Sequence, residues 1–294
     1  MSPDPQTFEA YRPLMFSIAY RMLGSAMEAE DILQEAYLRY QAVEAADIRS
    51  PKAYLCQIVT HLCLDQLKSA RVQRENYFGP WLPEPILTAE GPRAAASQRE
   101  SISTAFLVIL ESLSPAERAV FLLREVFDYS YAEIAEMLGK SEANCRQIGR
   151  RARQYVHQHR PRFEPSSGEQ ERLVNGFLKA IDSGDVAALT RLLAQDVAVY
   201  GDGGGKVPAA PRPVSGREKV VPFLMRVYRL LPTGAGVESA RVNGSPGLLF
   251  RSQGKLLGVV TFTFSGSRIQ AVYNLLNPEK LAYIERQRQE RRLE

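Results

Sequence analysis

The spacing of apolar residues changes along this 294-residue chain, and that change most limits what the chain can fold into. From residue 8 to about residue 160, apolar side chains recur every three or four positions, as in a helix that buries one face. Leu14, Ile18 and Met22 are an example. Later the apolar residues come in short alternating or continuous runs, which is typical of strands. The pattern predicts all-α domains followed by an α+β domain.

Two stretches rich in proline and glycine divide the chain further. The first, Gly79 to about Arg99, contains four prolines and predicts an extended linker, and the second is Pro161–Gly168. We expect a helical domain at 1–78, a linker at 79–100, a helical domain at 101–162, a linker at 163–169, and a domain at 170–294 with a charged helical tail. In the last domain we expect helices at about 170–182 and 185–194, a strand in "DVAVYGD", a helix in "GREKVVPFLMRVYRLL", and strands after it.

The composition favours a cytoplasmic protein without a metal or cofactor. The first residues lack the basic and apolar regions of a signal peptide. No apolar run approaches the roughly 20 residues that span a bilayer, so no membrane partner is expected. The three cysteines are scattered and read as reduced core thiols, and no second Cys/His pair completes a metal site.

Positive charge is concentrated in one segment that also carries a DNA-binding pattern. Residues 140–162 hold seven basic residues against Glu142 alone, a net charge of +6, whereas the whole chain carries +4. The stretch "SYAEIAEMLGKSEANCRQIGRRAR" has the form of a helix-turn-helix, in which Gly139 stops the first helix and Ser141 caps the second. The second helix suits the major groove. We expect base or phosphate contacts from Glu142, Asn144, Arg146, Gln147, Arg150, Arg151 and Arg153.

The upstream helices carry a family resemblance. "AEDILQEAYLRYQ", then "SPKAYLCQIVTHLCLDQLKSARVQRE" and the helix-turn-helix further on, resemble the bacterial sigma factors of the extracytoplasmic-function class over residues 8–160. The resemblance implies that this chain binds core RNA polymerase, through its β′ and β subunits, and promoter DNA. It assigns polymerase binding to Asp31, Gln34 and Glu35. It assigns the promoter −10 element to the helix that carries His61, Lys68, Arg71 and Arg74, and the −35 element to the helix-turn-helix. A carboxylate-lined helix suits a basic partner, and a basic helix suits an opened DNA strand.

The C-terminal part carries a second resemblance. Residues 170–281 resemble the SnoaL-like, NTF2-like cone fold, in which helices pack into a curled sheet around a pocket. Three stretches fit a subgroup of these sigma factors with such an extension: "WLPEP" (Trp81–Pro85), "DGGGK" (Asp202–Lys206) and "NPEKL" (Asn277–Leu281). The subgroup implies that the extension regulates the sigma domains of its own chain.

The glycines between Asp202 and Lys206 do not form a nucleotide-binding P-loop. That motif needs four residues between its first Gly and the Gly-Lys pair, then Ser or Thr and a helix. Here three residues separate Gly201 from Gly205, and Val207 and Pro208 follow Lys206. We expect a turn with positive φ that another segment approaches closely, and a flexible surface loop is the alternative.

We expect the three stretches to meet. Trp81 beside two prolines is a stiff ligand with an apolar anchor, and backbone N–H groups with a lysine suit the Glu84 carboxylate. The residues expected at this contact are Trp81, Leu82, Pro83, Glu84, Pro85, Asp202, Gly203, Gly204, Gly205, Lys206, Asn277 and Pro278.

The sequence leaves other functions open. Some cone-fold relatives are enzymes that use Asp, His or Tyr, but all three histidines precede this domain, so we do not expect an enzyme. A small-molecule ligand in its pocket stays an alternative. The rival to a sigma factor is a stand-alone helix-turn-helix regulator with a ligand-sensing C-terminal domain.

Overall fold

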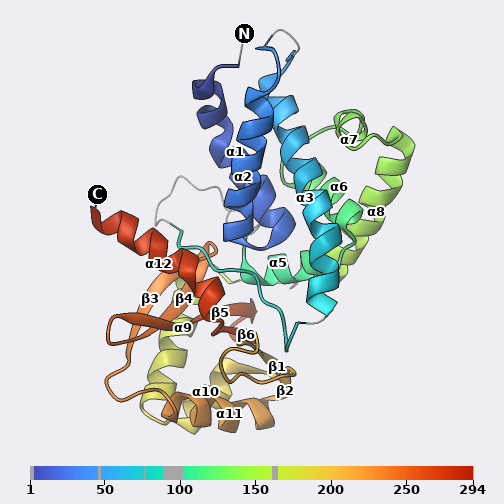
Figure 1. The fold of residues 1–294 in the computed structure, drawn as a ribbon. Helices are drawn as coiled ribbons and strands as arrows, with labels where there is room; N and C mark the ends of the chain where they lie inside the picture. The colour runs from blue at the N-terminus through green and yellow to red at the C-terminus, as the bar shows by residue number, and fades with distance from the viewer. Residues whose placement is uncertain (1–2, 46–47, 76, 89–101, 161–164, 294) are drawn as a thin grey trace. The chain divides into compact units, whose positions relative to one another are not determined.

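The computed structural model describes residues 3–45, 48–75, 77–88, 102–160 and 165–293, with the side chains of 70–75 and 291–293 excepted. The contacts divide the chain into two compact units (Figure 1). The first comprises Met1–Asn76 and Leu107–Arg160, and the second Tyr77–Phe106 and Pro161–Glu294. The described part of the linker thus belongs to the same unit as the C-terminal domain.

The first unit begins with three packed helices, α1 (Pro5–Leu23), α2 (Ala26–Gln41) and α3 (Pro51–Glu75). Asp4 caps α1 by accepting from the Gln6 N–H, and Gly24, at a φ of +70°, ends it. Each helix contributes buried side chains, for example Ile18, Leu33 and Val59, and the three helices contact one another. The helical pattern expected for this region is confirmed.

Among the residues that the structure describes, four further helices follow: α5 (Thr104–Glu111), α6 (Pro115–Glu125), α7 (Tyr131–Leu138) and α8 (Glu142–His159). The first unit includes them from Leu107 onward. Ser114 and Glu117 form a capping box at α6, and Ser130 and Glu133 form another at α7. Each box satisfies backbone N–H groups that a short helix leaves unpaired, so the sequence fixes where these helices begin.

Within the first unit, α6 and the turn after it pack on α1 and α3. Arg118 of α6 is 3% exposed and donates 2.6 Å to the backbone oxygen of Met22, while its second amino group pairs with Glu111 at 3.0 Å. The Tyr129 hydroxyl donates 3.1 Å to the Sγ of Cys56. The two helical domains inferred from the sequence therefore share a buried interface.

The second unit is an α+β domain, as expected. After α9 (Ser167–Asp182) and α10 (Val186–Leu192) the chain forms β1 (Leu193–Asp202), β2 (Val214–Ser215), α11 (Arg217–Arg229), β3 (Gly236–Val242), β4 (Ser245–Ser252), β5 (Lys255–Ser265), β6 (Arg268–Leu275) and α12 (Pro278–Leu293). The sheet order is β2-β1-β6-β5-β4-β3. Strand β1 runs parallel to β6, and the other pairs are antiparallel.

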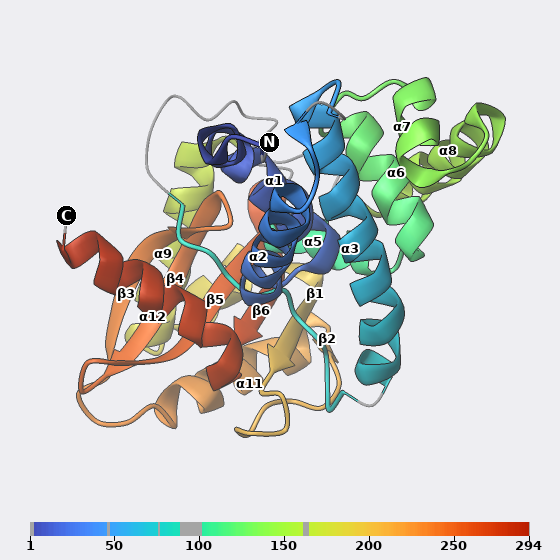
Figure 2. The ribbon, with the colours of Figure 1, turned by 45° about the horizontal axis from the view of Figure 1, so that its top comes forward.

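The core of this domain lies between the sheet and three helices. Helices α9, α10 and α11 cover one face, where Phe177, Leu189 and Val220 pack against Phe262 and Val272. Helix α12 lies along the sheet's other face (Figures 1 and 2). The charged tail that the sequence predicts as a helix forms part of α12. In the part of the chain that the structure describes, we find no helix long and apolar enough to cross a membrane.

The boundary between α10 and β1 differs from its prediction. The helix expected at 185–194 ends at Leu192, and β1 begins at Leu193 rather than at Asp196. Leu193 and Ala194 fit either element by polarity, but their burial against the core draws them into the strand.

Candidate functional site

The helix-turn-helix consists of α7 and α8. Gly139 ends α7 at a φ of +61°, and the Ser141 hydroxyl accepts from the Asn144 N–H at 3.3 Å to begin α8. Cys145 and Ile148 are buried and define the inner face of α8. Gly149 has no side chain, so the Tyr131 ring lies directly against α8. Capping and burial together fix which face of α8 meets solvent.

The outer face of α8 carries the residues of the helix-turn-helix for which the sequence predicts DNA contact. All of them are exposed: Glu142, Asn144, Arg146, Gln147, Arg150, Arg151 and Arg153. Three arginines have acidic partners, since Arg146 pairs with Glu142, Arg153 with Glu125 at 2.6 Å, and Arg151 with Glu117 at 3.8 Å. Arg150 has no hydrogen-bond or ion-pair partner among the residues that the structure describes. Its charge is therefore free to meet a phosphate.

The residues predicted to dock on polymerase share one face of α2. Asp31, Gln34 and Glu35 are exposed, while Ile32, Leu33 and Ala36 are buried behind them. Glu35 pairs with Arg39 at 2.9 Å, one turn further along. The arrangement leaves a polar, partly acidic surface on α2.

The residues predicted for the −10 element lie on α3. His61 and Lys68 are exposed on it, and Lys68 pairs with Asp65 at 2.8 Å. The side chains of Arg71 and Arg74 lie outside the described residues. An exposed pair such as Lys68–Asp65 is weak, so a DNA phosphate can compete for this lysine.

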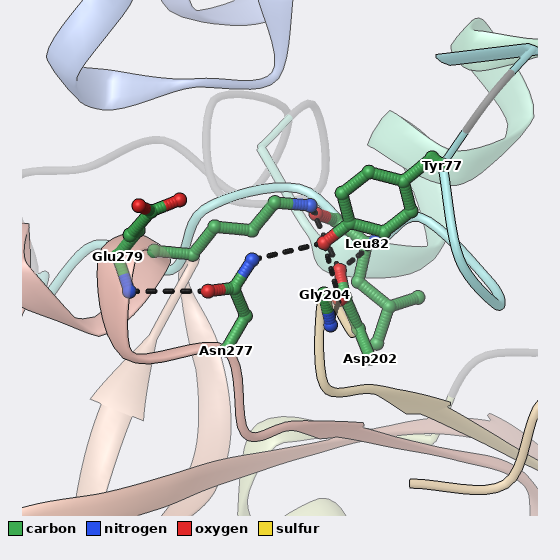
Figure 3. A network of polar contacts seen from close by, with 7 residues as sticks. Tyr77, Leu82, Asp202, Gly204, Asn277 and Glu279 are labelled. Atoms are coloured by element: carbon green, nitrogen blue, oxygen red, sulfur yellow. Dashed lines mark hydrogen bonds and ion pairs between the residues drawn. The ribbon is translucent and has the colours of Figure 1, made fainter. Parts of the chain in front are cut away.

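In the second unit, the buried carboxylate of Asp202 holds the linker (Figure 3). Its side chain is 0% exposed and accepts four hydrogen bonds. The Leu82 N–H donates at 2.8 Å, the Tyr77 hydroxyl at 2.6 Å, the Lys280 ammonium at 2.8 Å and the Gly204 N–H at 3.1 Å. We call Tyr77, Leu82, Asp202, Gly204, Asn277 and Lys280 the Asp202 network.

Lys280 connects the linker to the start of α12. Its ammonium group donates to the Leu82 backbone oxygen at 2.6 Å as well as to Asp202, so both backbone polar groups of Leu82 are satisfied. It also lies 4.1 Å from the centre of the Trp81 ring and 4.8 Å from that of Tyr77, within cation–π range. Burial and the bond to Asp202 raise the pKa of Tyr77, so its hydroxyl stays a donor at neutral pH.

The glycine turn allows this close approach, as expected. Gly204 and Gly205 have φ values of +59° and +71°. A Cβ on Gly204 would collide with the amide of Asn277, which itself donates 2.9 Å to the Tyr77 hydroxyl. The loop after Lys206 does not enter a helix, in keeping with the exclusion of a P-loop.

The rest of the described linker pairs with the sheet edge and with α12. Pro83, Glu84 and Pro85 are buried, and Ile86 exchanges hydrogen bonds with Asn243. Leu87 bridges Val242 of β3 in antiparallel fashion. The Gln287 side chain of α12 accepts from the Leu87 N–H at 2.8 Å and donates to its oxygen at 3.3 Å. The linker thus extends the sheet next to β3.

Two details differ from the sequence-based expectation. Lys206 pairs with Glu279 rather than with Glu84, because Asn277 caps α12 and brings Glu279 beside the turn. Leu82 is only 2% exposed, while Trp81 is half-buried against Lys280.

Sequence reasoning missed Tyr77, Lys280 and Gln287. Lys280 lies within the quoted "NPEKL" stretch, but a lysine usually reads as a solvated charge. Gln287 lies in a tail whose composition suggests only a charged helix. The position of Lys280 inside the "NPEKL" motif was the one sequence feature that could have indicated its part in the contact.

Comparison with known proteins defines the class of this chain. Residues 7–72 match the family model for sigma-70 region 2, and residues 103–156 match the model for sigma-70 region 4. These ranges cover most of α1–α3 and of the helix-turn-helix, so the helical unit has the two conserved regions of a sigma factor.

Whole-chain relatives narrow the class. The chain is 36% identical to the ECF RNA polymerase sigma factor SigJ of Mycobacterium tuberculosis over 287 residues, which cover 93% of this chain and 91% of SigJ. It is 28% identical to the probable ECF sigma factor SigI of the same species, over 95% of each chain. The crystal structure of M. tuberculosis SigJ matches with a TM-score of 0.77 at 34% identity, over 95% of this chain and 99% of SigJ. The chain belongs to the ECF RNA polymerase sigma factors, and the resemblance noted in the sequence is confirmed.

Proposed function

We propose that this protein is a sigma subunit that directs core RNA polymerase to promoters with defined −10 and −35 elements. The observation that supports this most is the combination, in one chain, of a sigma-70 region 2 match with a capped helix-turn-helix in region 4. As a subunit of bacterial polymerase it would act in the cytoplasm and catalyse no reaction of its own.

Charge supports a role for each set of residues, and so does exposure where the side chains are described. Asp31, Gln34 and Glu35 of α2 would meet a basic surface of polymerase. On α3, His61, Lys68, Arg71 and Arg74 would follow the backbone of the opened −10 strand. On α8, Arg146 and its neighbours near the helix start would reach −35 base edges, and Arg150 a phosphate.

A pull-down with core polymerase tests the sigma role. The full chain should bind core enzyme and support transcription from a −10/−35 template, whereas a Glu35→Lys variant should bind more weakly. Glu44→Lys, which lies beyond the end of α2, is the control for charge alone. If the chain binds duplex DNA but forms no complex with core enzyme at micromolar concentration, a stand-alone regulator is the better assignment.

We also propose that the C-terminal domain regulates the sigma domains through the Asp202 network. The linker joins α3 to α5, so a segment fixed by hydrogen bonds at Leu82, Ile86 and Leu87 shortens the free connection between the two DNA-reading parts. A shift of a few kcal/mol in this docking changes the docked fraction by orders of magnitude. Promoter binding would respond to that fraction.

A matched pair of glycine variants tests the regulatory role. Gly204→Ala places a methyl group against Asn277 and Tyr77, whereas Gly266→Ala has a similar φ, +55° against +59°, and open space around it. Both incur the cost of a left-handed residue, about 1–2 kcal/mol. Only Gly204→Ala should change transcription and speed trypsin cleavage after Arg93 or Arg99. Equal output and equal cleavage in both variants would show that the domain does not regulate through this contact.

A further inference from the structure

The C-terminal domain contains a partly open cavity that is separate from the contacts with the linker. It has a volume of about 90 Å³ and lies between the helices and the inner face of the sheet. Helix α9 contributes Phe177 and Ile181, helix α11 contributes Leu224 and Val227, and the sheet contributes Val260 and Val272. Interiors are usually packed without voids of this size, because each lost contact destabilises the fold.

The polar groups of the cavity limit what it can hold. No charged side chain lines it in the described part of the chain, so a charged ligand would lose its hydration without compensation. The Tyr228 hydroxyl already donates 2.8 Å to Asp182 at the rim. The Asn274 amide also lines the cavity and makes no hydrogen bond with any described residue. One amide is therefore available inside apolar walls.

We propose that this cavity binds a small uncharged apolar molecule that carries a single hydrogen-bonding group. The apolar walls supply affinity, and the Asn274 amide, which can donate and accept, orients the polar group. A volume of about 150 Å³ accommodates benzene in an engineered protein cavity, so a ligand of about that size would fill this one and protrude through its opening.

The cavity wall continues directly into the Asp202 network. Asn274 and Leu276 line the cavity, and the backbone N–H groups of Leu276 and Asn277 donate 2.7 and 2.9 Å to the Asp202 backbone oxygen. Gly258 limits the room behind Leu276, because a Cβ there would lie 2.7 Å from the Leu276 Cδ2. A ligand that displaces Leu276 therefore shifts the segment that positions Asp202. This coupling rests on the proposed regulatory function, whereas binding itself does not.

Binding is tested with cyclohexanol as the probe, on the full chain without polymerase. Cyclohexanol should shift the methyl NMR signals of Leu224 and Val272 saturably, with a Kd of about 1 mM for so few atoms. Val227→Phe fills the cavity and should weaken binding at least tenfold. Leu230→Phe adds the same ring at a site that is 73% exposed, and should leave binding unchanged.

A second variant separates the amide from the apolar walls. Asn274→Leu should weaken cyclohexanol binding several-fold and leave binding of methylcyclohexane, which has no hydroxyl group, equal or tighter. Absence of saturable shifts in the wild type, or equal binding by the wild type and Val227→Phe, would overturn the proposal.

The coupling has its own optical readout, because Trp81 is the only tryptophan and its ring lies against Lys280. Trp81 fluorescence should change with the same midpoint as the methyl shifts, and should not respond in Val227→Phe. A saturated cavity with unchanged Trp81 fluorescence would refute the coupling while the binding site stands. The assay contains no polymerase, so failure of the sigma assignment would not alter either result.

Discussion

Asp202 and Lys280 are an ion pair withdrawn from water, with side-chain exposures of 0% and 9%. Burying two charges costs hydration energy, which their attraction and their hydrogen bonds must offset. Here the carboxylate has four donors, and the ammonium has a second acceptor and two aromatic rings. The pair therefore depends on the linker being docked, because Leu82 supplies two of those partners.

Removing the Asp202 charge should release the linker. Asp202→Asn removes the carboxylate charge that pairs with the buried Lys280, and losing one partner of a buried pair costs about 3–5 kcal/mol. We expect a lower urea midpoint for the transition reported by Trp81 fluorescence. Lys206→Ala, which removes an exposed pair with Glu279, should change stability by less than about 1 kcal/mol. Similar losses in both variants would contradict a special role for the buried pair.

Three tyrosines predict how stability changes in alkali. Burial and a hydrogen bond raise the pKa of both Tyr77 and Tyr129 above the ordinary value of 10.0. Burial raises the pKa of Tyr273 to about 12. Above pH 10 the unfolded state loses these protons while the folded state keeps them. The contribution of the three tyrosines to the free energy of unfolding is therefore complete below pH 10 and falls as the pH rises above it.

Alkaline titration with tyrosinate absorbance and circular dichroism checks this. The buried tyrosines should ionise together with unfolding rather than before it, and Tyr129→Phe should make the first unit less sensitive to alkali. Ionisation of every tyrosine near pH 10, with unchanged circular dichroism, would show that these hydroxyls are not buried in solution.

At the scale of elements, the exposed arginines of α8 differ in whether an acidic side chain pairs with them. Arg150→Ala removes a charge that has no partner in the described part of the chain, and it should reduce the salt slope of promoter binding by about one counterion. Arg153→Ala should reduce it less, because Glu125 already neutralises that charge. Binding of promoter DNA at several salt concentrations measures both, and a larger effect from Arg153 would mean that another face of α8 meets DNA.

Arg146 should affect specificity instead. It lies near the start of α8 and stacks 5.2 Å from the Tyr131 ring centre, which restricts its orientation. Arg146→Ala should cost about 1–3 kcal/mol at the preferred −35 sequence and little at altered ones. Competition with altered −35 sequences tests this, and uniform weakening across sequences would reassign Arg146 to a phosphate.

Helix ends and turns that depend on neighbouring residues could be predicted from the sequence. Hydrogen bonds between residues far apart in the sequence could not. Gly139 and Ser141 set the turn of the helix-turn-helix by their own backbone preferences. The meeting of the linker with the glycine turn followed from matched motifs, but its chemistry did not. Which carboxylate accepts from Leu82 depends on packing across 120 residues, so Asp202 could not be distinguished from Glu84 as the acceptor.

At the scale of the whole molecule, the interface in the first unit bears on promoter geometry. Under the proposed assignment, α3 and α8 read elements about 25 base pairs apart, which is about 85 Å of DNA at 3.4 Å per pair. A compact unit of this length has a radius of gyration of roughly 14 Å, so α3 and α8 cannot span that distance while Arg118 of α6 bonds to Met22 at the end of α1. The helical domains must separate before both elements are bound.

Arg118→Ala should favour separation, because it removes the buried hydrogen bonds to Met22 and Glu111. Spin labels on Leu38→Cys and Gln154→Cys, both exposed, report the distance between α2 and α8. The natural cysteines are buried, and burial raises the pKa of Cys56 and Cys63, so they should label slowly. Arg118→Ala should add a population at longer distance, and Arg39→Ala, at an exposed pair, should not. An unchanged distance distribution in Arg118→Ala would show that this contact does not hold the domains together.

The Arg118 interface also bears on how the protein searches a genome. A closed chain can engage one promoter element at a time, and single-element contacts compete poorly with the vast excess of ordinary sequence. Molecules of this protein that are not bound to core polymerase would then leave promoters unoccupied, even when they are in excess. Promoter choice would be made only after assembly with polymerase, and transcript output would track the number of assembled complexes rather than the total amount of this protein.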